Sequence, residues 1–133
     1  MRIQSEGIIS YRIGDDKLFR VVVLVEKDIV ALARSLVPKY IRLSPQKYDP
    51  HVTVLRELAI LRASKWLAHQ GKLAPFAYDP EIQVGDVYFW LNVYSSYLEE
   101  LRVELGLERI GPGARPPDES DNFHTTIGNR KSG

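Results

Sequence analysis

Two short segments of the chain carry the side chains best suited to chemistry. Residues 51–54 read His-Val-Thr-Val, and residues 124–127 read His-Thr-Thr-Ile. The chain contains three His and three Thr, so two of its three His are followed by a Thr two positions later. One such pattern would carry little information, whereas two copies are a specific signal.

Strand geometry explains why this spacing matters. Successive side chains of a β-strand alternate between its two faces, so His51 and Thr53 share one face, as do His124 and Thr126. Neighbours on one face lie about 6.6 Å apart. Val52 and Val54 then point towards a core, and Thr125 and Ile127 share the corresponding face of the second strand. An imidazole and a hydroxyl can then contact the same phosphate-sized group from two positions.

Cleavage of a phosphodiester beside a ribose hydroxyl suits these residue types. A base must take a proton from the attacking oxygen and an acid must give one to the leaving oxygen, and histidine can do both near neutral pH. We therefore predict His51 and His124 as catalytic residues, with their individual roles left open. The hydroxyls of Thr53 and Thr126 would bind phosphate oxygens and stabilise charge in the transition state. This scheme requires no metal and no cofactor.

The same residues also allow a structural role or a metal site. A lone His on a strand is more often structural, and His69, which has no Thr partner, is interpreted as a surface residue. Asp49 lies near His51, and Asp121 near His124, so a site of two His and a carboxylate could bind a metal. Both Asp residues lie in expected loops, which favours the metal-independent interpretation.

Four further residues are weaker substrate-binding candidates. Tyr40 and Arg115 lie in the polar loops that lead to the two motifs. Trp90 and Phe123 are aromatic residues near the motifs that could stack on a base. Core packing is the competing role for aromatic residues, and for the alternating positions of residues 87–94 it is favoured.

Length and composition limit the classes of function. With 133 residues the chain is expected to form one domain. Its formal net charge of +1 lacks the basic excess of long-RNA binders, so a small nucleotide, or at most an RNA end, is the expected partner. The absence of cysteine excludes disulfides and thiolate metal sites. No apolar run has the length of a membrane span or signal peptide, so we expect a cytoplasmic protein, monomeric and away from membranes.

Hydrophobic periodicity predicts the elements that must position the motifs. Apolar and β-branched runs, or alternation, predict strands at 7–13, 18–25, 51–55, 72–78, 87–94 and 123–127. Spacing of apolar residues at i, i+3, i+4 predicts helices at 29–36, with Asp28 as N-cap, and at 58–70. A capping-box sequence at 96–99 predicts a third helix that ends at Gly106.

The two halves follow the same order of strong strand, helix, polar loop and motif strand. This repetition predicts an α+β fold of two pseudo-symmetric lobes, about 1–70 and 71–133, within a single domain. Each lobe would contain a small antiparallel-rich sheet with helices. The two motif strands would meet at a central cleft.

Paired His-x-Thr-x strands in two weakly similar halves resemble the 2H phosphoesterase superfamily, also called LigT-like or 2′-5′ RNA ligase-like. The segment 123–129, Phe-His-Thr-Thr-Ile-Gly-Asn, looks like small phage-encoded members. The resemblance implies a metal-independent phosphodiesterase in which His51, Thr53, His124 and Thr126 are the functional residues. It implies as substrates cyclic oligonucleotides, 2′-5′ oligonucleotides or 2′,3′-cyclic phosphates. The alternatives are an enzyme that repairs or processes RNA ends and an inactive nucleotide- or RNA-binding module of the same fold.

Overall fold

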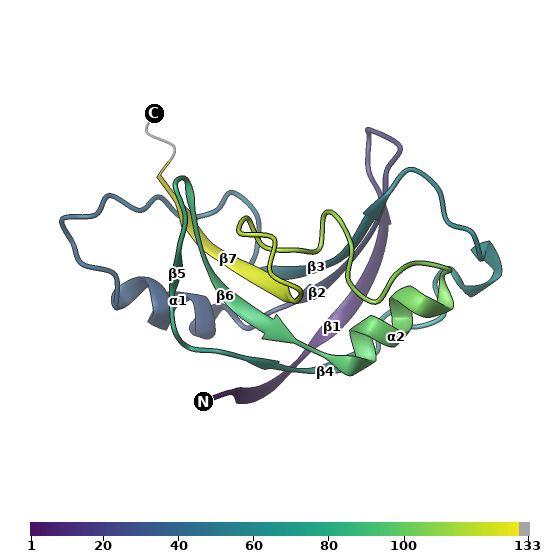
Figure 1. Ribbon diagram of the computed structural model, residues 1–133, viewed down its shortest axis with the longest axis horizontal. Coiled ribbons are helices and arrows are strands. Elements are labelled where there is room, and N and C mark those ends of the chain that lie inside the picture. Colours follow the sequence, from purple (N-terminus) through teal and green to yellow (C-terminus); the bar gives the residue numbers. More distant parts are fainter. Residues whose placement is uncertain (131–133) are drawn as a thin grey trace.

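The computed structural model describes residues 1–130. Within this range the chain forms seven strands, two α-helices and one short 3₁₀ turn (Figure 1). The strands are β1 (Ile3–Ile13), β2 (Phe19–Leu24), β3 (His51–Glu57), β4 (Leu73–Tyr78), β5 (Gln83–Val84), β6 (Tyr88–Tyr94) and β7 (Phe123–Asn129). The helices are α1 (Lys27–Ser35) and α2 (Ser96–Glu104), and the 3₁₀ turn is Ala63–Lys65.

Six of the strands close into an antiparallel barrel. The order is β4-β1-β2-β3-β7-β6, and β6 returns to pair with β4, while β5 extends the sheet beyond β6. The predicted α+β class is confirmed, but the prediction of two lobes with separate sheets is wrong. The reason is β4, which follows the expected boundary at residue 70 yet pairs with β1 at six positions. One sheet therefore contains strands from both halves.

The two helices lie towards opposite ends of the molecule (Figure 1). Helix α2 places Leu98, Leu101 and Leu105 in the main core, against the inward side chains of β1, β2, β3 and β4. Helix α1 uses Val30 and Ala33 to form a second cluster with residues of β6 and β7. No helix within residues 1–130 is long and apolar enough to cross a membrane.

Helix α2 begins and ends through local backbone chemistry. Its N-cap is Ser95, whose hydroxyl accepts a hydrogen bond from the Leu98 amide at 3.1 Å. The helix thus begins one residue earlier than a capping box starting at Ser96 would place it. Gly106 ends it with φ of +88°, the left-handed conformation that glycine adopts readily at this position. The predicted C-terminus is confirmed.

The predicted helix at 58–70 is wrong, because the segment forms a loop with one 3₁₀ turn. The leucines that suggested a buried helix face are not covered: Leu58 and Leu61 are each 81% exposed. Trp66 anchors the loop by packing edge-on against Tyr11 and Phe19, with ring centroids 4.9 and 5.1 Å apart. Tertiary contacts of one aromatic residue therefore override the local helical pattern.

Two strands change register at corresponding places. In β3, Thr53 pairs with Val22 and Leu55 pairs with Val21, which leaves Val54 as an extra residue. In β7, residues 126 and 128 pair with Trp90 and Phe89, which leaves residue 127 unpaired. Such bulges increase local twist and re-aim the neighbouring side chains.

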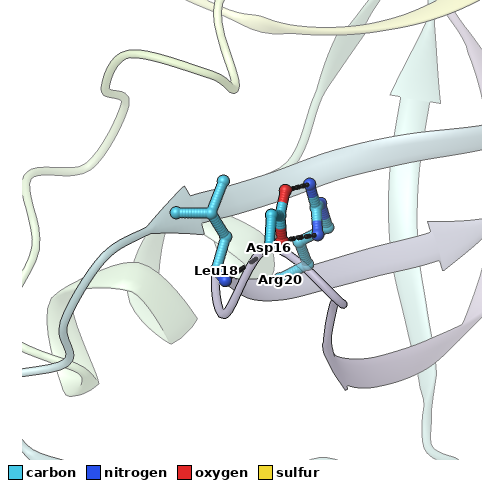
Figure 2. Close-up of polar contacts among 3 residues, drawn as sticks. All are labelled: Asp16, Leu18 and Arg20. Carbon is cyan, nitrogen blue, oxygen red and sulfur yellow. Dashed lines mark hydrogen bonds and ion pairs between the residues drawn. The ribbon is translucent and has the colours of Figure 1, made fainter.

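The β1–β2 turn is fixed by the Asp16 carboxylate (Figure 2). It accepts two hydrogen bonds from the Arg20 guanidinium, at 3.0 and 2.6 Å, and one from the Leu18 amide at 3.1 Å. The hydrogen bonds from Arg20, followed by that from Leu18, lower the pKa of Asp16 to about 2. These hydrogen bonds join the β1–β2 turn to the start of β2, the strand that pairs with the motif strand β3.

Asp16→Asn is expected to lower the melting temperature slightly at neutral pH. Because the folded-state pKa of Asp16 lies below its unfolded value, its contribution is complete above the unfolded pKa and is lost as pH falls towards about 2. The difference in melting temperature between the wild type and the variant should therefore narrow between pH 4 and pH 2, as measured by circular dichroism. Asp15→Asn is the control, since Arg20 contacts Asp16; an equal effect of both variants would contradict the assignment.

Candidate functional site

The two motif strands are neighbours in the barrel. β3 and β7 are antiparallel, with Val52 opposite Thr125. Val52 and Thr125 are the middle residues of the two His-x-Thr motifs, so this pairing brings the two motifs side by side.

All four motif side chains line one pocket of about 390 Å³. The pocket is also lined by residues of α1 and by residues 45–50, the segment immediately before β3. The remaining lining residues are Lys27, Val30, Ala31, Arg34, Pro45, Gln46, Lys47, Tyr48, Asp49, Pro50 and Ile127. The pocket combines the two imidazoles and two hydroxyls with an apolar side and several cations.

A hydrogen bond to the backbone orients each imidazole. Nδ1 of His51 lies 2.8 Å from the Asp49 carbonyl oxygen, and Nδ1 of His124 lies 3.1 Å from the Ala114 carbonyl oxygen. A carbonyl oxygen only accepts, so Nδ1 is the donor in both rings. This leaves Nε2 of each ring as the nitrogen that exchanges a proton with a ligand.

The environment of His124 favours its neutral form. Burial lowers the pKa of His124, and the nearby His51 lowers it further. The hydrogen bond to Ala114 and the charge of Asp118 act in the opposite direction without cancelling the effect of burial. A neutral imidazole with Nδ1 occupied presents a basic Nε2 lone pair, which suits a proton acceptor.

Thr125, expected on the core side of its strand, forms a direct link between the two motifs. It is 1% exposed, and its hydroxyl donates a hydrogen bond to the His51 carbonyl oxygen at 2.9 Å. It therefore joins β7 to β3 at the first motif histidine. The sequence could have predicted this hydrogen bond, because the second hydroxyl of the Thr-Thr pair at 125–126 lies on the buried face and needs an internal partner.

The four weaker candidates do not reach the pocket in the described part of the chain. Tyr40 is 85% exposed, and Arg115 forms an ion pair with Asp121 at 3.1 Å. Trp90 is 3% exposed and donates to Asn92 at 3.1 Å. Phe123 is fully buried in the core, where it cannot stack on a base.

Tyr48 and Lys47 take the place of these candidates at the pocket wall. Tyr48 is 70% exposed, and Lys47 lies 5.8 Å from its ring centroid. Their position in the sequence, just before the first motif, could have identified them as lining residues. The α1 residues of the wall had no sequence signal, because only the fold brings α1 beside the motifs.

Each of the two carboxylates that a metal site would recruit forms an ion pair. Asp49, which lines the pocket, lies 3.5 Å from the ammonium group of Lys27, and Asp121 pairs with Arg115. Over residues 1–130, no three His, Asp or Glu side chains gather in an arrangement that could hold a metal ion.

No family model matches the chain, and no curated protein or solved structure matches it either.

Interaction between the two imidazoles can be tested in solution. His51→Gln removes a group that can become positively charged beside His124, so we expect the pKa of His124 to rise while burial keeps it below the ordinary value. The measurement is a pH titration of the imidazole signals by NMR. His69→Gln, which changes the histidine outside the pocket, should leave the titration of His124 unchanged. An unchanged His124 titration in the His51 variant would show that the two rings do not interact.

Proposed function

We propose that this protein is a metal-independent phosphodiesterase of the 2H type, which cleaves a small nucleotide by general acid–base catalysis. The supporting observation is that both His-x-Thr pairs line one pocket, with each imidazole held through Nδ1 by a backbone carbonyl. Two such imidazoles can act on the attacking and leaving oxygens of one phosphate.

The proposed roles of the two histidines differ. His124, kept neutral by burial, accepts through Nε2 the proton of the attacking water or ribose hydroxyl. The attacking oxygen forms a bond to phosphorus, and the bond from phosphorus to the leaving oxygen breaks. His51, in its protonated form, donates a proton to that leaving oxygen. The hydroxyls of Thr53 and Thr126 donate to the non-bridging oxygens, where charge increases in the transition state.

The pocket and the overall charge favour a small substrate. A volume of about 390 Å³ lies in the range of small-ligand sites, and the lining cations Lys27 and Lys47 suit a phosphate-bearing molecule. With a net charge of +1 the chain lacks the basic excess that binding to long RNA usually requires. We propose a cyclic oligonucleotide, a 2′-5′ oligonucleotide or a 2′,3′-cyclic phosphate as substrate. Degradation of a cytoplasmic signalling nucleotide by a monomer is the corresponding biological role.

Replacing either histidine should abolish most of the activity. His51→Ala and His124→Ala are each expected to lower kcat by about 10²–10⁴-fold, the usual contribution of a general acid or base. The assay is a panel of the three substrate classes with chelator present, read by chromatography. His69→Gln is the matched control and should retain wild-type turnover.

The panel also separates the proposal from its alternatives. Cleavage confined to RNA termini would favour an enzyme that processes RNA ends. Tight binding with no cleavage of any nucleotide would indicate a binding module and would contradict the catalytic proposal. Wild-type turnover in either histidine variant would refute the acid–base scheme.

The assignment of base and acid predicts a dependence on the leaving group. A p-nitrophenyl ester of a nucleotide releases a weakly basic phenolate that needs little protonation, so loss of the general acid should lower kcat less on this substrate. The loss of kcat in His51→Ala, relative to the wild type on the same substrate, is expected to be at least 10-fold smaller than on a natural phosphodiester. His124→Ala should remain equally impaired on both substrates. Recovery in the His124 variant alone would reverse the two roles.

A further inference from the structure

Both motif strands carry a bulge immediately after the motif Thr. The extra residue is Val54 in β3 and Ile127 in β7. A bulged residue falls out of the regular ladder, so its carbonyl oxygen must find a partner elsewhere. Each bulge thus leaves one carbonyl oxygen, next to a motif Thr, that needs a hydrogen-bond donor from outside the sheet.

An arginine from a helix meets each of these requirements. Nη1 of Arg102, from α2, donates to the Val54 carbonyl oxygen at 2.8 Å. Nη1 of Arg34, from α1, donates to the Ile127 carbonyl oxygen at 3.1 Å. The arrangement is crossed: the first helix acts on the second motif strand, and the second helix acts on the first.

Each arginine also contacts a loop. Nε of Arg102 donates to the Glu108 carbonyl oxygen at 2.7 Å. This loop continues to Ala114, whose carbonyl orients His124. Arg102 therefore links the strand that carries Thr53 to the loop that holds the imidazole of the other motif.

Arg34 makes the corresponding link on the other side. Its Nη2 donates to the Leu43 carbonyl oxygen at 3.2 Å. This segment continues to Asp49, whose carbonyl orients His51. The strand that carries Thr126 is thereby tied to the loop that holds the first imidazole.

A glycine leaves room for each guanidinium. A Cβ added at Gly111 would lie 2.2 Å from Nη2 of Arg102, and one added at Gly128 would lie 2.7 Å from Nη1 of Arg34. Such distances are incompatible with the observed positions of the guanidinium groups. The observed position of the Arg102 guanidinium therefore requires glycine at 111, and that of Arg34 requires glycine at 128.

We propose that Arg34 and Arg102 are positioning residues for the proposed reaction, each bracing one motif strand against the loop that orients the imidazole of the other motif. The inference rests on the proposed function for its catalytic consequence. Its geometric part, the control of imidazole orientation, holds for any chemistry of the pocket.

Arginine has the chemistry that two-point bracing requires. Its planar guanidinium presents several N–H donors in a fixed arrangement, whereas a lysine ammonium acts as one compact donor. Arg102 is 1% exposed and makes no ion pair with any residue of 1–130, so its contacts with the carbonyls replace a carboxylate partner. Substitution by lysine keeps the charge and removes the two-point geometry.

The first test reads imidazole orientation and needs no activity. In NMR spectra of the neutral rings, the wild type should show both His51 and His124 protonated at Nδ1. Arg102→Lys should lower the Nδ1-protonated fraction of His124 and leave that of His51 unchanged, and Arg34→Lys should do the reverse. Arg20→Lys, in β2, is the control and should change neither ring, because the side-chain partner of Arg20 is Asp16 and not a carbonyl beside either motif.

The second test measures turnover of the Arg102 variants, since Arg34 lines the pocket and could also contact substrate. Arg102→Lys and Gly111→Ala are each expected to lower kcat by about 10–100-fold, the cost of misplacing a catalytic group by about 1 Å. KM should stay within about 2-fold. Circular dichroism establishes that each variant is folded at the assay temperature.

The outcomes separate bracing from a general role in stability. Folded variants that melt at a lower temperature but keep wild-type tautomers and kcat would overturn the proposal, as would equal changes of both rings in each variant. If the wild type cleaves no phosphodiester, the proposed function fails, and the crossed tautomer changes still decide whether the arginines orient the imidazoles.

Discussion

The two motifs are brought together where β3 meets β7, and backbone pairing between these two strands is sparse. β3 and β7 pair at one position, Val52 opposite Thr125, so most of the β3 edge facing β7 lacks a regular ladder. Backbone polar groups that are buried must still be paired. A side chain adds a further link between these strands, because the Thr125 hydroxyl donates to the His51 carbonyl oxygen. Arg102 meets a separate need at the bulge between β2 and β3, where it donates to the Val54 carbonyl oxygen.

The energetics of Arg102 indicate that its contribution is mainly to geometry. Burying a guanidinium without a carboxylate is costly, and burial lowers the pKa of Arg102. Its hydrogen bonds to the Val54 and Glu108 carbonyls are charge-assisted, each of about 1.5–3 kcal/mol. These terms oppose each other, so the net contribution of Arg102 to stability is smaller than its hydrogen bonds alone suggest. An apolar side chain would leave the Val54 and Glu108 carbonyl oxygens without donors, and the bulge beside Thr53 without the hydrogen bond from Arg102.

Much of the fold could be predicted from local sequence patterns, and the wrong predictions have a common cause. The central strands β2 and β6 were predictable, because a strand buried on both faces needs a continuous run of apolar, β-branched or aromatic residues. The motif strands were predictable from their alternation of polar and apolar residues. The end of α2 was predictable from Gly106, since the required conformation favours glycine. The pairing of β4 with β1 left no local trace, because pairing partners far apart in sequence are chosen by tertiary packing. The helix predicted at 58–70 was wrong for the same reason, because Trp66 packs against Tyr11 and Phe19, which lie far from it in the sequence.

In the candidate site, the reactive side chains could be predicted from the sequence, whereas the backbone groups that orient them could not. Four motif residues could be located because imidazole and hydroxyl groups at alternate positions have a recognisable spacing. The groups that orient the imidazoles are carbonyl oxygens of Asp49 and Ala114, and every residue has a carbonyl, so sequence alone could not identify them. The internal repetition seen in the sequence is real in the motif strands, their bulges and the arginine that meets each bulge. It differs from two separate lobes because each helix braces the motif strand of the other half, so neither half would be complete without the other.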